Sequence, residues 1–414
     1  MSDVIREKPV HTPMDQFRSE GGELMVGGIP LHRLADRVGQ TPFYAYDREL
    51  LTQRVAELRG ALPVGIKIHY AMKANPMPAV VDHMARLVDG IDVASGRELK
   101  VALDSGANPH EISFAGPGKR HEELRQAVAA GILINIESFR EVFELAAIRQ
   151  GTGWPVRVAV RVNPDFELKS SGMKMGGGPK QFGVDAEQVP ALLAKIGEAG
   201  LAFEGFHLFA GSQNLRPEAI VEAQRKCFDL ALRLAENAPS PVKFLNLGGG
   251  FGIPYFPGEK RLDLSSISAN LAAIAAEAKE KLPQAEIVIE LGRYLVGEAG
   301  IYVCKILDRK VSRGHTFLVA DGGLHHHLSA SGNFGQVIRK NYPVAIGDRI
   351  GSPPDEAVSV VGPLCTPLDI LADRMALPKA HPGNLVVVFQ SGAYGASASP
   401  QAFLDQPKVV EVMV

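Results

Sequence analysis

Lys73 is the residue whose type and position best suit amine chemistry on a carbonyl group. Residues 66–70 alternate apolar and polar side chains, a pattern that predicts a short strand. Pro76 ends this pattern, because the residue before a proline is driven away from helical angles. We therefore expect Lys73 just beyond a strand end, where partial desolvation would favour the neutral, nucleophilic amine. A lysine in such a place is commonly only a solvated surface charge. Whether Lys73 is catalytic therefore depends on which residues lie at the ends of the other strands.

Polar side chains and glycines also accompany the ends of the other predicted strands. They are Asp92 and Ser95 at the second strand, Arg161 and Asn163 at the fifth, His207 and Ser212 at the sixth, Gly248, Gly249 and Gly250 at the seventh, and Glu290 and Arg293 at the eighth. If these strands run parallel, their carboxyl ends meet at one rim. An amine, an imidazole, a carboxylate, a guanidinium and a glycine-rich loop would then converge there.

The elements that must position these residues alternate between strands and helices from about residue 48 to residue 300. Strand patterns occur at 66–70, 90–94, 112–115, 133–136, 156–162, 204–208, 244–247 and 285–290, and helical patterns between them at 79–87, 98–103, 121–129, 139–148, 217–235 and 267–281. Such alternation indicates a parallel sheet with right-handed crossovers. Eight units over roughly 240 residues favour an α/β fold of the (β/α)8 TIM-barrel type over an open sheet.

The rest of the chain is expected to form a second domain. Residues 301–414 contain short β-type runs separated by Gly, Pro and Asp, which predict a C-terminal antiparallel β domain. Residues 1–47 also contain short strand patterns and are expected to contribute to that domain. The segment 169–183 is too rich in glycine for a regular element, and we interpret it as a mobile loop beside the site.

Composition argues against several classes of protein. The 414 residues include 44 Lys+Arg and 46 Asp+Glu without a long basic run, so neither nucleic acid nor a membrane is expected as a partner. No run approaches the ~18–20 apolar residues that span a bilayer, and residues 1–18 do not resemble a signal peptide. The cysteines Cys227, Cys304 and Cys365 lack metal-ligand spacing, so we expect free thiols in a reducing cytoplasm.

The strand-end residues together match the needs of pyridoxal phosphate (PLP). The backbone of Gly248–Gly250 could cradle a phosphate, since no Cβ blocks a close approach, and Arg293 could complete this site as a charged donor. A buried Glu290 needs a cationic partner, for which a protonated pyridine nitrogen would serve. His207 could be a satisfied core histidine or could stack on an aromatic ring. With a lysine for a Schiff base, this set describes PLP.

A metal site competes poorly with this interpretation. The densest histidine cluster is the run His325, His326 and His327, and adjacent side chains do not converge on one ion as spaced ligands do. We interpret the run as a polar turn or rim and expect no metal.

Seven motifs, in their order and spacing, resemble the fold type III PLP-dependent decarboxylases, the family of diaminopimelate and ornithine decarboxylases. They are Tyr70–Asn75, Asp92–Ser95, His207 with Gly211–Gln213, Gly248–Gly252, Glu290–Arg293, Gly362–Cys365 and Gly392–Gly395. The resemblance extends from about residue 41 to residue 404. It implies a PLP-dependent α-decarboxylase on a TIM barrel with a C-terminal β domain.

The resemblance also implies roles for individual residues. Lys73 is similar to the lysine that binds the cofactor, His207 to the ring that stacks on it, and Glu290 to the partner of the pyridine nitrogen. Cys365 resembles the acid that protonates Cα, a transfer for which a thiol is suited. The remaining implied cofactor contacts are Asp92, Arg161, Ser212, Gly248, Gly249, Gly250, Arg293 and Tyr394. The family implies a homodimer with shared active sites, in which the partner subunit donates the cysteine loop.

Three departures from the family pattern bear on the substrate. Thr366 follows Cys365 where diaminopimelate decarboxylases usually have a glutamate and ornithine decarboxylases an aspartate. An Arg-Pro-x-Leu-Tyr segment is missing near residues 325–335, and four residues rather than two separate His207 from Ser212. We take Thr366 and Asp369 as candidate substrate contacts. Loss of a charged partner in a pocket is enough to change the preferred substrate.

These departures resemble a side branch of the family used in specialised biosynthesis, with decarboxylases of aminoacyl carrier proteins, of siderophore clusters, and of exosortase and exopolysaccharide systems. The leading hypothesis is α-decarboxylation of a small amino acid or of an aminoacyl group on an acyl-carrier protein. The alternatives are a diaminopimelate decarboxylase with an atypical distal pocket, a non-catalytic PLP-binding paralogue, and a racemase on a similar barrel.

Overall fold

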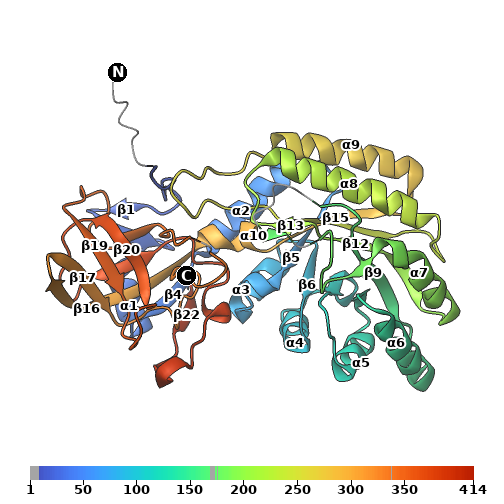
Figure 1. Ribbon diagram of the computed structural model, residues 1–414, viewed down its shortest axis with the longest axis horizontal. Coiled ribbons are helices and arrows are strands. Elements are labelled where there is room, and N and C mark those ends of the chain that lie inside the picture. The colour runs from blue at the N-terminus through green and yellow to red at the C-terminus, as the bar shows by residue number, and fades with distance from the viewer. Residues whose placement is uncertain (1–8, 168–172, 175, 337) are drawn as a thin grey trace. The chain divides into compact units, whose positions relative to one another are not determined.

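The computed structural model of the chain describes residues 9–167, 173–174, 176–336 and 338–414 (Figure 1). The chain forms two compact units. The barrel unit comprises residues 53–252 and 262–295, and the β unit comprises residues 1–52, 253–261 and 296–414.

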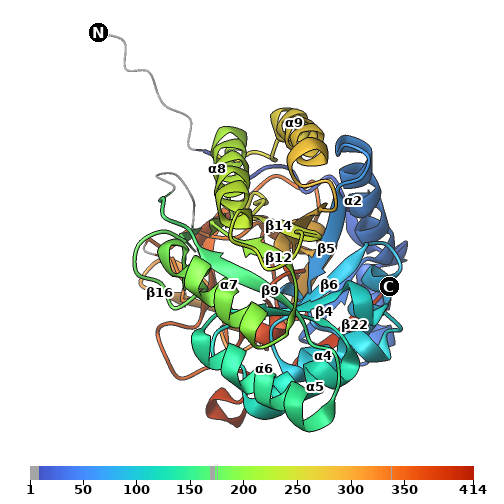
Figure 2. The same ribbon diagram turned by 90° about the vertical axis from the view of Figure 1, so that its right-hand side faces the viewer.

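Eight parallel strands of the barrel unit close on themselves, which confirms the predicted TIM barrel (Figure 2). They are β5 (Lys67–Ala71), β6 (Gly90–Val93), β7 (Ile112–Phe114), β8 (Leu133–Ile136), β9 (Arg157–Asn163), β12 (Ala202–Leu208), β14 (Phe244–Gly249) and β15 (Glu286–Leu291), after which β15 pairs with β5. The strands are rich in Val, Ile and Leu because a sheet covered by helices is buried on both faces. The two-residue strand β11 (Val184–Asp185) pairs with β9 at one point of the barrel.

Helices lie around the outside of these strands (Figure 2). They are α3 (Pro78–Ala85), α4 (Gly96–Asp104), α5 (His121–Ala130), α6 (Phe139–Thr152), α7 (Val189–Glu198), α8 (Pro217–Ala235) and α9 (Ser265–Lys281). Helix α2 (Arg48–Ala61) precedes β5, and the short α10 (Arg293–Val296) follows β15. Ser95 and Ser138 begin α4 and α6 as N-caps by accepting hydrogen bonds from the helix backbone. None of the helices in the described ranges has the length and apolar character needed to cross a bilayer.

The β unit is built on one large, mostly antiparallel sheet, as predicted. Its main path runs β18 (Val344–Ile346), β21 (Leu385–Val388), β16 (Gly300–Ser312), β17 (His315–Ala320), β19 (Glu356–Val361) and β20 (Ile370–Leu377). Strand β4 (Phe43–Tyr46) pairs with β16 and with β22 (Val410–Met413). Two pairs, β17 with β19 and β22 with β4, are parallel rather than antiparallel.

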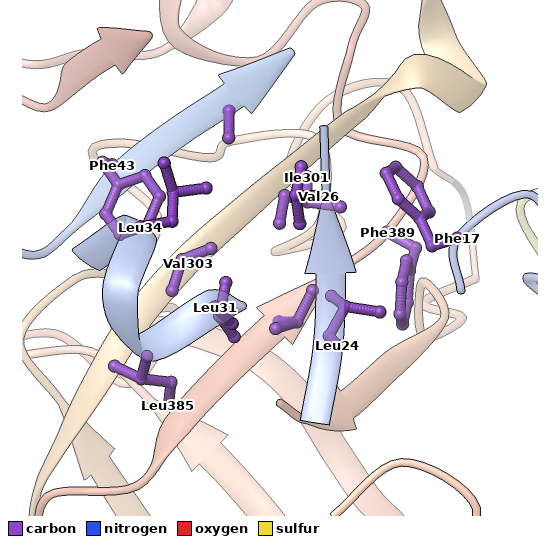
Figure 3. Close-up of a cluster of buried hydrophobic side chains, with 12 residues drawn as sticks. Phe17, Leu24, Val26, Leu31, Leu34, Phe43, Ile301, Val303, Leu385 and Phe389 are labelled. Carbon is purple, nitrogen blue, oxygen red and sulfur yellow. The ribbon is translucent and has the colours of Figure 1, made fainter. Parts of the chain in front are cut away.

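A compact hydrophobic core supports this sheet (Figure 3). It joins β4, β16 and β21 to the N-terminal elements β2 (Glu23–Val26) and α1 (Leu31–Val38); β1 (Ser19–Glu20) and β3 (Ile29–Pro30) flank β2. Phe43, Ile301 and Val387 are fully buried within it. Residues near the two ends of the chain therefore belong to the same folded unit.

The glycine-rich segment 169–183 contains one element that the sequence analysis did not anticipate. Residues 168–172 and 175 lie outside the described residues, so the predicted mobility of that part stays a prediction. The short strand β10 (Met173–Lys174) pairs antiparallel with β13 (Gly211–Ser212). This pairing brings the segment to Ser212, one of the predicted site residues.

Candidate functional site

Layers of inward-facing side chains fill the barrel. Four apolar residues form one buried cluster: Leu133, Ala159, Phe244 and Val288. Two residues further along each strand, and so on the same face, stand four buried polar residues: Asn135, Arg161, Asn246 and Glu290. The interior therefore changes from apolar to polar toward the carboxyl ends of the strands, where barrels of this type place their active sites.

Glu290 and His207 meet in this polar layer. Oε2 of Glu290 lies 2.7 Å from Nε2 of His207 and accepts a hydrogen bond from Nδ2 of Asn246 at 3.1 Å. Among the described residues neither ring nitrogen of His207 has a hydrogen-bond partner, so the carboxylate oxygen lies away from the N–H direction. Burial alone would raise the pKa of Glu290, but His207, Lys73 and Arg161 hold that pKa well below its usual range. The site thus contains a buried, ionised carboxylate.

Lys73 lies in a single 3-10 turn, Met72–Ala74, that follows β5 directly. Its ammonium is 5.7 Å from the centroid of the Phe209 ring. Gly292 packs so closely on this turn that a Cβ there would lie 2.8 Å from Cβ of Ala74, which brings the adjacent Arg293 to the same corner of the rim. The expected desolvation of Lys73 is wrong for the single chain, because the turn carries its side chain to the exposed side of the packed strand ends.

Arg161 is held in place by Glu137, which the sequence analysis did not identify. NH1 of Arg161 donates to Oε1 of Glu137 at 2.9 Å, and the backbone N–H of Gly183 donates to Oε2 at 3.0 Å. Burial would raise the pKa of Glu137, but Arg161, Lys119 and the backbone N–H of Gly183 together lower it. This salt bridge holds the Arg161 guanidinium in the polar layer, where it also lowers the pKa of Glu290.

Asp92 points into the barrel, where it meets His69 and Ser113. Its Oδ1 lies 3.0 Å from Nδ1 of His69 and accepts a hydrogen bond from Oγ of Ser113 at 2.6 Å. Burial lowers the pKa of His69, but Asp92 raises it to a net value above the ordinary range. A Cβ at Gly90 would lie 2.4 Å from Nε2 of His69, so the ring fits only beside a glycine. Asp92 is thus engaged with interior side chains, and its role as a cofactor contact stays a prediction.

The glycine loop after β14 packs directly on the backbone of its neighbours. A Cβ at Gly249 would lie 2.2 Å from the carbonyl oxygen of Glu290, and a Cβ at Gly250 would lie 2.1 Å from that of Gly211. A larger residue at either position would have to displace backbone atoms, which explains the glycines. The loop therefore lies against β13, and it brings Ser212 beside the predicted phosphate cradle.

The other predicted site residues lie in the β unit. Cys365 is exposed and Thr366 is partly buried in the loop between β19 and β20. Asp369 ends this loop and is buried, and its carboxylate accepts hydrogen bonds from the backbone N–H groups of Leu324 at 2.6 Å and Leu364 at 2.8 Å. Asp369 therefore organises the cysteine loop, which leaves its predicted role as a substrate contact without support.

Tyr394 lies in the loop that follows β21. Its φ of 52° is in the left-handed region, which is uncommon for a residue other than glycine and concentrates at functional sites. The hydroxyl of Ser329 donates to the carbonyl oxygen of Tyr394 at 3.0 Å and so anchors the loop in this conformation.

The histidine run begins in a turn, as expected, but it is buried, so the expected place at a polar rim is wrong. His325, His326 and His327 are 0–1% exposed. Nδ1 of His327 accepts a hydrogen bond from the backbone N–H of Ala330 at 3.2 Å, and its Nε2 lies 2.9 Å from Oγ of Ser391. The partner Ser391 lies 64 residues away, so a local sequence pattern does not reveal this contact of His327. In the part of the chain that the structure describes, no three His, Cys, Asp or Glu side chains are grouped to hold a metal ion.

Asn246, Glu137 and His69 belong to the barrel interior but were not singled out from the sequence. Each is a polar residue in or directly after a barrel strand. The signal that could have found them is their spacing, since each lies two residues from another inward-facing position on its strand. A polar residue at such a position needs a partner, and partners cluster where the interior is polar.

The barrel residues fit PLP. The glycine loop carries backbone N–H groups without side chains beside Ser212. Glu290 offers an ionised carboxylate to a pyridine nitrogen, and the buried ring nitrogens of His207 have no hydrogen-bond partner among the described residues. Lys73 supplies an accessible amine at the same rim. These are the groups through which a protein binds and tunes this cofactor.

Comparison with known proteins agrees with the geometry. Residues 48–297 match the family described as "Pyridoxal-dependent decarboxylase, pyridoxal binding domain". L-glutamyl-[BtrI acyl-carrier protein] decarboxylase of Niallia circulans is 38% identical to this chain, over 90% of the chain and 89% of that protein. Diaminopimelate decarboxylase of Aquifex aeolicus is 32% identical over 98% and 93% of the two chains. The crystal structure of diaminopimelate decarboxylase from Helicobacter pylori complexed with L-lysine has a TM-score of 0.81 at 27% identity and covers 92% of this chain and 94% of that one.

The polar layer of the barrel, the glycine cradle, the rim lysine and these similarities lead to one conclusion: the chain belongs to the pyridoxal-dependent decarboxylases.

Proposed function

We propose that this PLP-dependent decarboxylase acts on an aminoacyl group attached to a carrier protein. The observation that carries the proposal is the chemistry of the cysteine loop. Between Gly362 and Asp369 the one carboxylate is that of Asp369, and both of its oxygens are bound by backbone N–H groups. The position after Cys365 is Thr366, which has no charge. The loop therefore offers no ready partner to the distal ammonium group of a free diamino acid.

The similarity to L-glutamyl-[BtrI acyl-carrier protein] decarboxylase supports the same substrate class. An amino acid whose far end is joined to a carrier has no distal ammonium group to neutralise, so an uncharged threonine suits it. A pocket built for a charged group discriminates strongly against substrates that leave that charge unpaired.

Bound PLP supplies an electron sink for the pair left behind when CO2 departs. The residues of this chain prepare that step. We assign Lys73 to hold the cofactor and to exchange it with the substrate amine. Glu290 keeps a proton on the pyridine nitrogen, since its own pKa is held low. The buried ring of His207 orients the cofactor plane.

The remaining assignments concern the phosphate and the returning proton. We assign the backbone of Gly248–Gly250, together with Ser212, Arg293 and Tyr394, to the phosphate. Arg161, fixed by Glu137, keeps positive charge close to Glu290. Cys365 returns a proton to Cα after CO2 has left.

We also propose that the enzyme is a homodimer in which each active site receives the cysteine loop of the partner. Cys365 is exposed in the single chain, although a proton transfer to carbon benefits from exclusion of water. Leu368, in the same loop, is 57% exposed. Its carbonyl oxygen accepts a hydrogen bond from Nδ2 of Asn333 at 3.4 Å, and Phe334, the residue after Asn333, is 43% exposed. Exposed apolar residues around a reactive group are what a subunit interface would cover.

We further propose that the enzyme works in a reducing cytoplasm, where its three free cysteines would stay unpaired.

Release of labelled CO2 tests the substrate. The purified enzyme with PLP is given L-glutamate attached to an acyl-carrier protein, free L-glutamate, or diaminopimelate, each labelled in the α-carboxyl group. We expect kcat/KM to be at least about 100-fold higher for the carrier-bound substrate than for either free amino acid. A preference for free diaminopimelate would overturn the proposal and support the alternative, a diaminopimelate decarboxylase.

The variant Thr366→Glu provides a matched control, because it restores the carboxylate expected of diaminopimelate decarboxylases. We expect it to raise diaminopimelate turnover about tenfold or more and to lower turnover of the carrier-bound substrate. If neither activity changed, the cysteine loop would not determine specificity.

A further inference from the structure

We infer that Asn246 is a positioning residue. Its side chain links Glu290, at the proposed pyridine-nitrogen end of the cofactor site, to Gly248, at the proposed phosphate end. The inference rests on the proposed roles of Glu290 and the glycine loop. Asn246 lies on β14 in the polar layer of the barrel and is 0% exposed. It has no exposed surface through which to contact solvent, so its polar atoms must be satisfied inside the protein.

Both halves of the Asn246 amide are engaged. Nδ2 donates to Oε2 of Glu290 at 3.1 Å, and Oδ1 accepts from the backbone N–H of Gly248 at 2.8 Å. A carboxylate only accepts and a backbone N–H only donates, so these two partners fix which end of the amide is which. One planar group therefore connects the carboxylate of one strand with the first glycine of the phosphate loop.

The connection restricts the Glu290 carboxylate. Asn246 and His207 both contact Oε2 of Glu290. We assign Oε1 to the pyridine nitrogen, since Oε2 is already held from two sides. The backbone packs tightly at the same corner, because the carbonyl oxygen of Glu290 lies only 2.2 Å from the place of a Cβ on Gly249. A change at Asn246 thus affects the nitrogen end and the phosphate end of the site together.

Two substitutions of Asn246 distinguish its effect on the pyridine-nitrogen end of the site from its effect on the phosphate end. Asn246→Asp keeps an acceptor for the N–H of Gly248 but replaces the donor to Glu290 with a second carboxylate. Like charges so close to each other raise the pKa of one of them, which weakens the hold on a protonated ring nitrogen. Asn246→Ala removes both contacts. Asn135→Ala is the matched control, since Asn135 is also 0% exposed in the same layer while its amide donates to Ser113 at 3.1 Å.

The readout is binding of three compounds to the full-length apoprotein, followed by fluorescence: PLP, its 1-deaza analogue without the ring nitrogen, and pyridoxal without the phosphate. We expect Asn246→Asp to weaken PLP binding about tenfold or more and to leave affinity for the deaza analogue within about threefold of the wild type. We expect Asn246→Ala to lower, in addition, the ratio of PLP affinity to pyridoxal affinity. Asn135→Ala should change all three affinities by the same factor, since it removes a buried amide whose hydrogen bond is to Ser113 rather than to Glu290 or Gly248.

Two results would overturn the inference. One is PLP binding by Asn246→Asp within about threefold of the wild type, and the other is an equal loss for PLP and the deaza analogue, as a packing defect would give. A wild-type chain that binds no PLP would instead refute the proposed function. The failure of the inference and the failure of the function are therefore distinguishable.

Discussion

Nε2 of His207 lies 2.7 Å from Oε2 of Glu290, and both side chains are almost completely buried in the barrel. Burial raises the pKa of a carboxyl group, yet the pKa of Glu290 is held well below its usual range by His207 and by the nearby cations Lys73 and Arg161. A lowered pKa keeps the carboxylate ionised at neutral pH, and this charge is lost only as the pH falls below the ordinary range of glutamate. The enzyme thus has a buried negative charge at neutral pH, which suits the proposed role of Glu290 as the partner of the pyridine nitrogen.

Substitution of this carboxylate should reduce catalysis far more than it reduces cofactor binding. We expect Glu290→Gln to lower kcat by at least about 100-fold, because a neutral amide does not stabilise the protonated ring in the reacting state. Its PLP affinity, measured by fluorescence titration, should fall by a smaller factor, since the phosphate contacts remain. A kcat within about threefold of the wild type would show that another group holds the ring proton.

Lys73→Ala should abolish covalent attachment of PLP without damage to the fold. The side chain is exposed in the single chain, so the free energy of unfolding should change by no more than about 1 kcal/mol. Borohydride reduces the link between PLP and the lysine and makes it permanent. Mass spectrometry of the peptides should then find the cofactor on Lys73 in the wild type and on no peptide of the variant. Lys73→Arg is the control that keeps the charge but not the reactive amine, and it should fail in the same way. Undiminished turnover by either variant would refute the assignment of Lys73.

The barrel could be predicted from sequence because its signal is local and repeated. All eight predicted strands are present, since each is a short β-type pattern that lies between helical or turn segments. Strands β20 and β22 were not named in advance. Strand β20 carries Asp373 and Arg374 in its middle, Arg374 has a φ of 46°, and its register against β19 shifts twice, so no regular alternation is visible.

Site residues could be predicted where they belong to a recognisable sequence motif. They could not be predicted where their role depends on a partner that is distant in the sequence. The glycines of the cradle and the residues beside them stand out in the sequence. Glu137 and Asn246 do not, because their meaning depends on Arg161 and Glu290, which lie on other strands. The polar contact of the buried His327 likewise involves Ser391, 64 residues away.

His327 should make the β unit sensitive to acid. Its Nδ1 accepts from the backbone N–H of Ala330, so the folded state holds the neutral imidazole, and burial lowers its pKa to about 3. The ordinary pKa of histidine is about 6.5, so between that pH and the folded value the unfolded chain binds one more proton than the folded chain. Stability is therefore fully present above pH ~6.5 and declines as the pH falls, by up to about 1.4 kcal/mol per pH unit.

Urea unfolding followed by circular dichroism at pH 7 and pH 5 measures this decline. His327→Gln removes the titrating group and keeps a polar side chain of similar reach. We expect it to be less stable than the wild type at pH 7 and to lose less stability on going to pH 5. An equal loss in both proteins would show that other groups dominate the acid response.

A mixture of two inactive variants should recover activity if each site combines residues from two chains. In a homodimer with shared sites, Lys73→Ala and Cys365→Ala each impair both sites, because each site needs Lys73 from one chain and Cys365 from the other. In a heterodimer of the two variants, one site carries both substitutions and the other carries neither. Random exchange of subunits at equal concentrations makes half of the dimers heterodimers, so recovery should approach about one quarter of wild-type activity. Analytical ultracentrifugation of the mixture should show dimers. If activity stayed at the level of the separate variants while subunits exchanged, Lys73 and Cys365 of the same chain would serve the same site, and the shared-site dimer would be refuted.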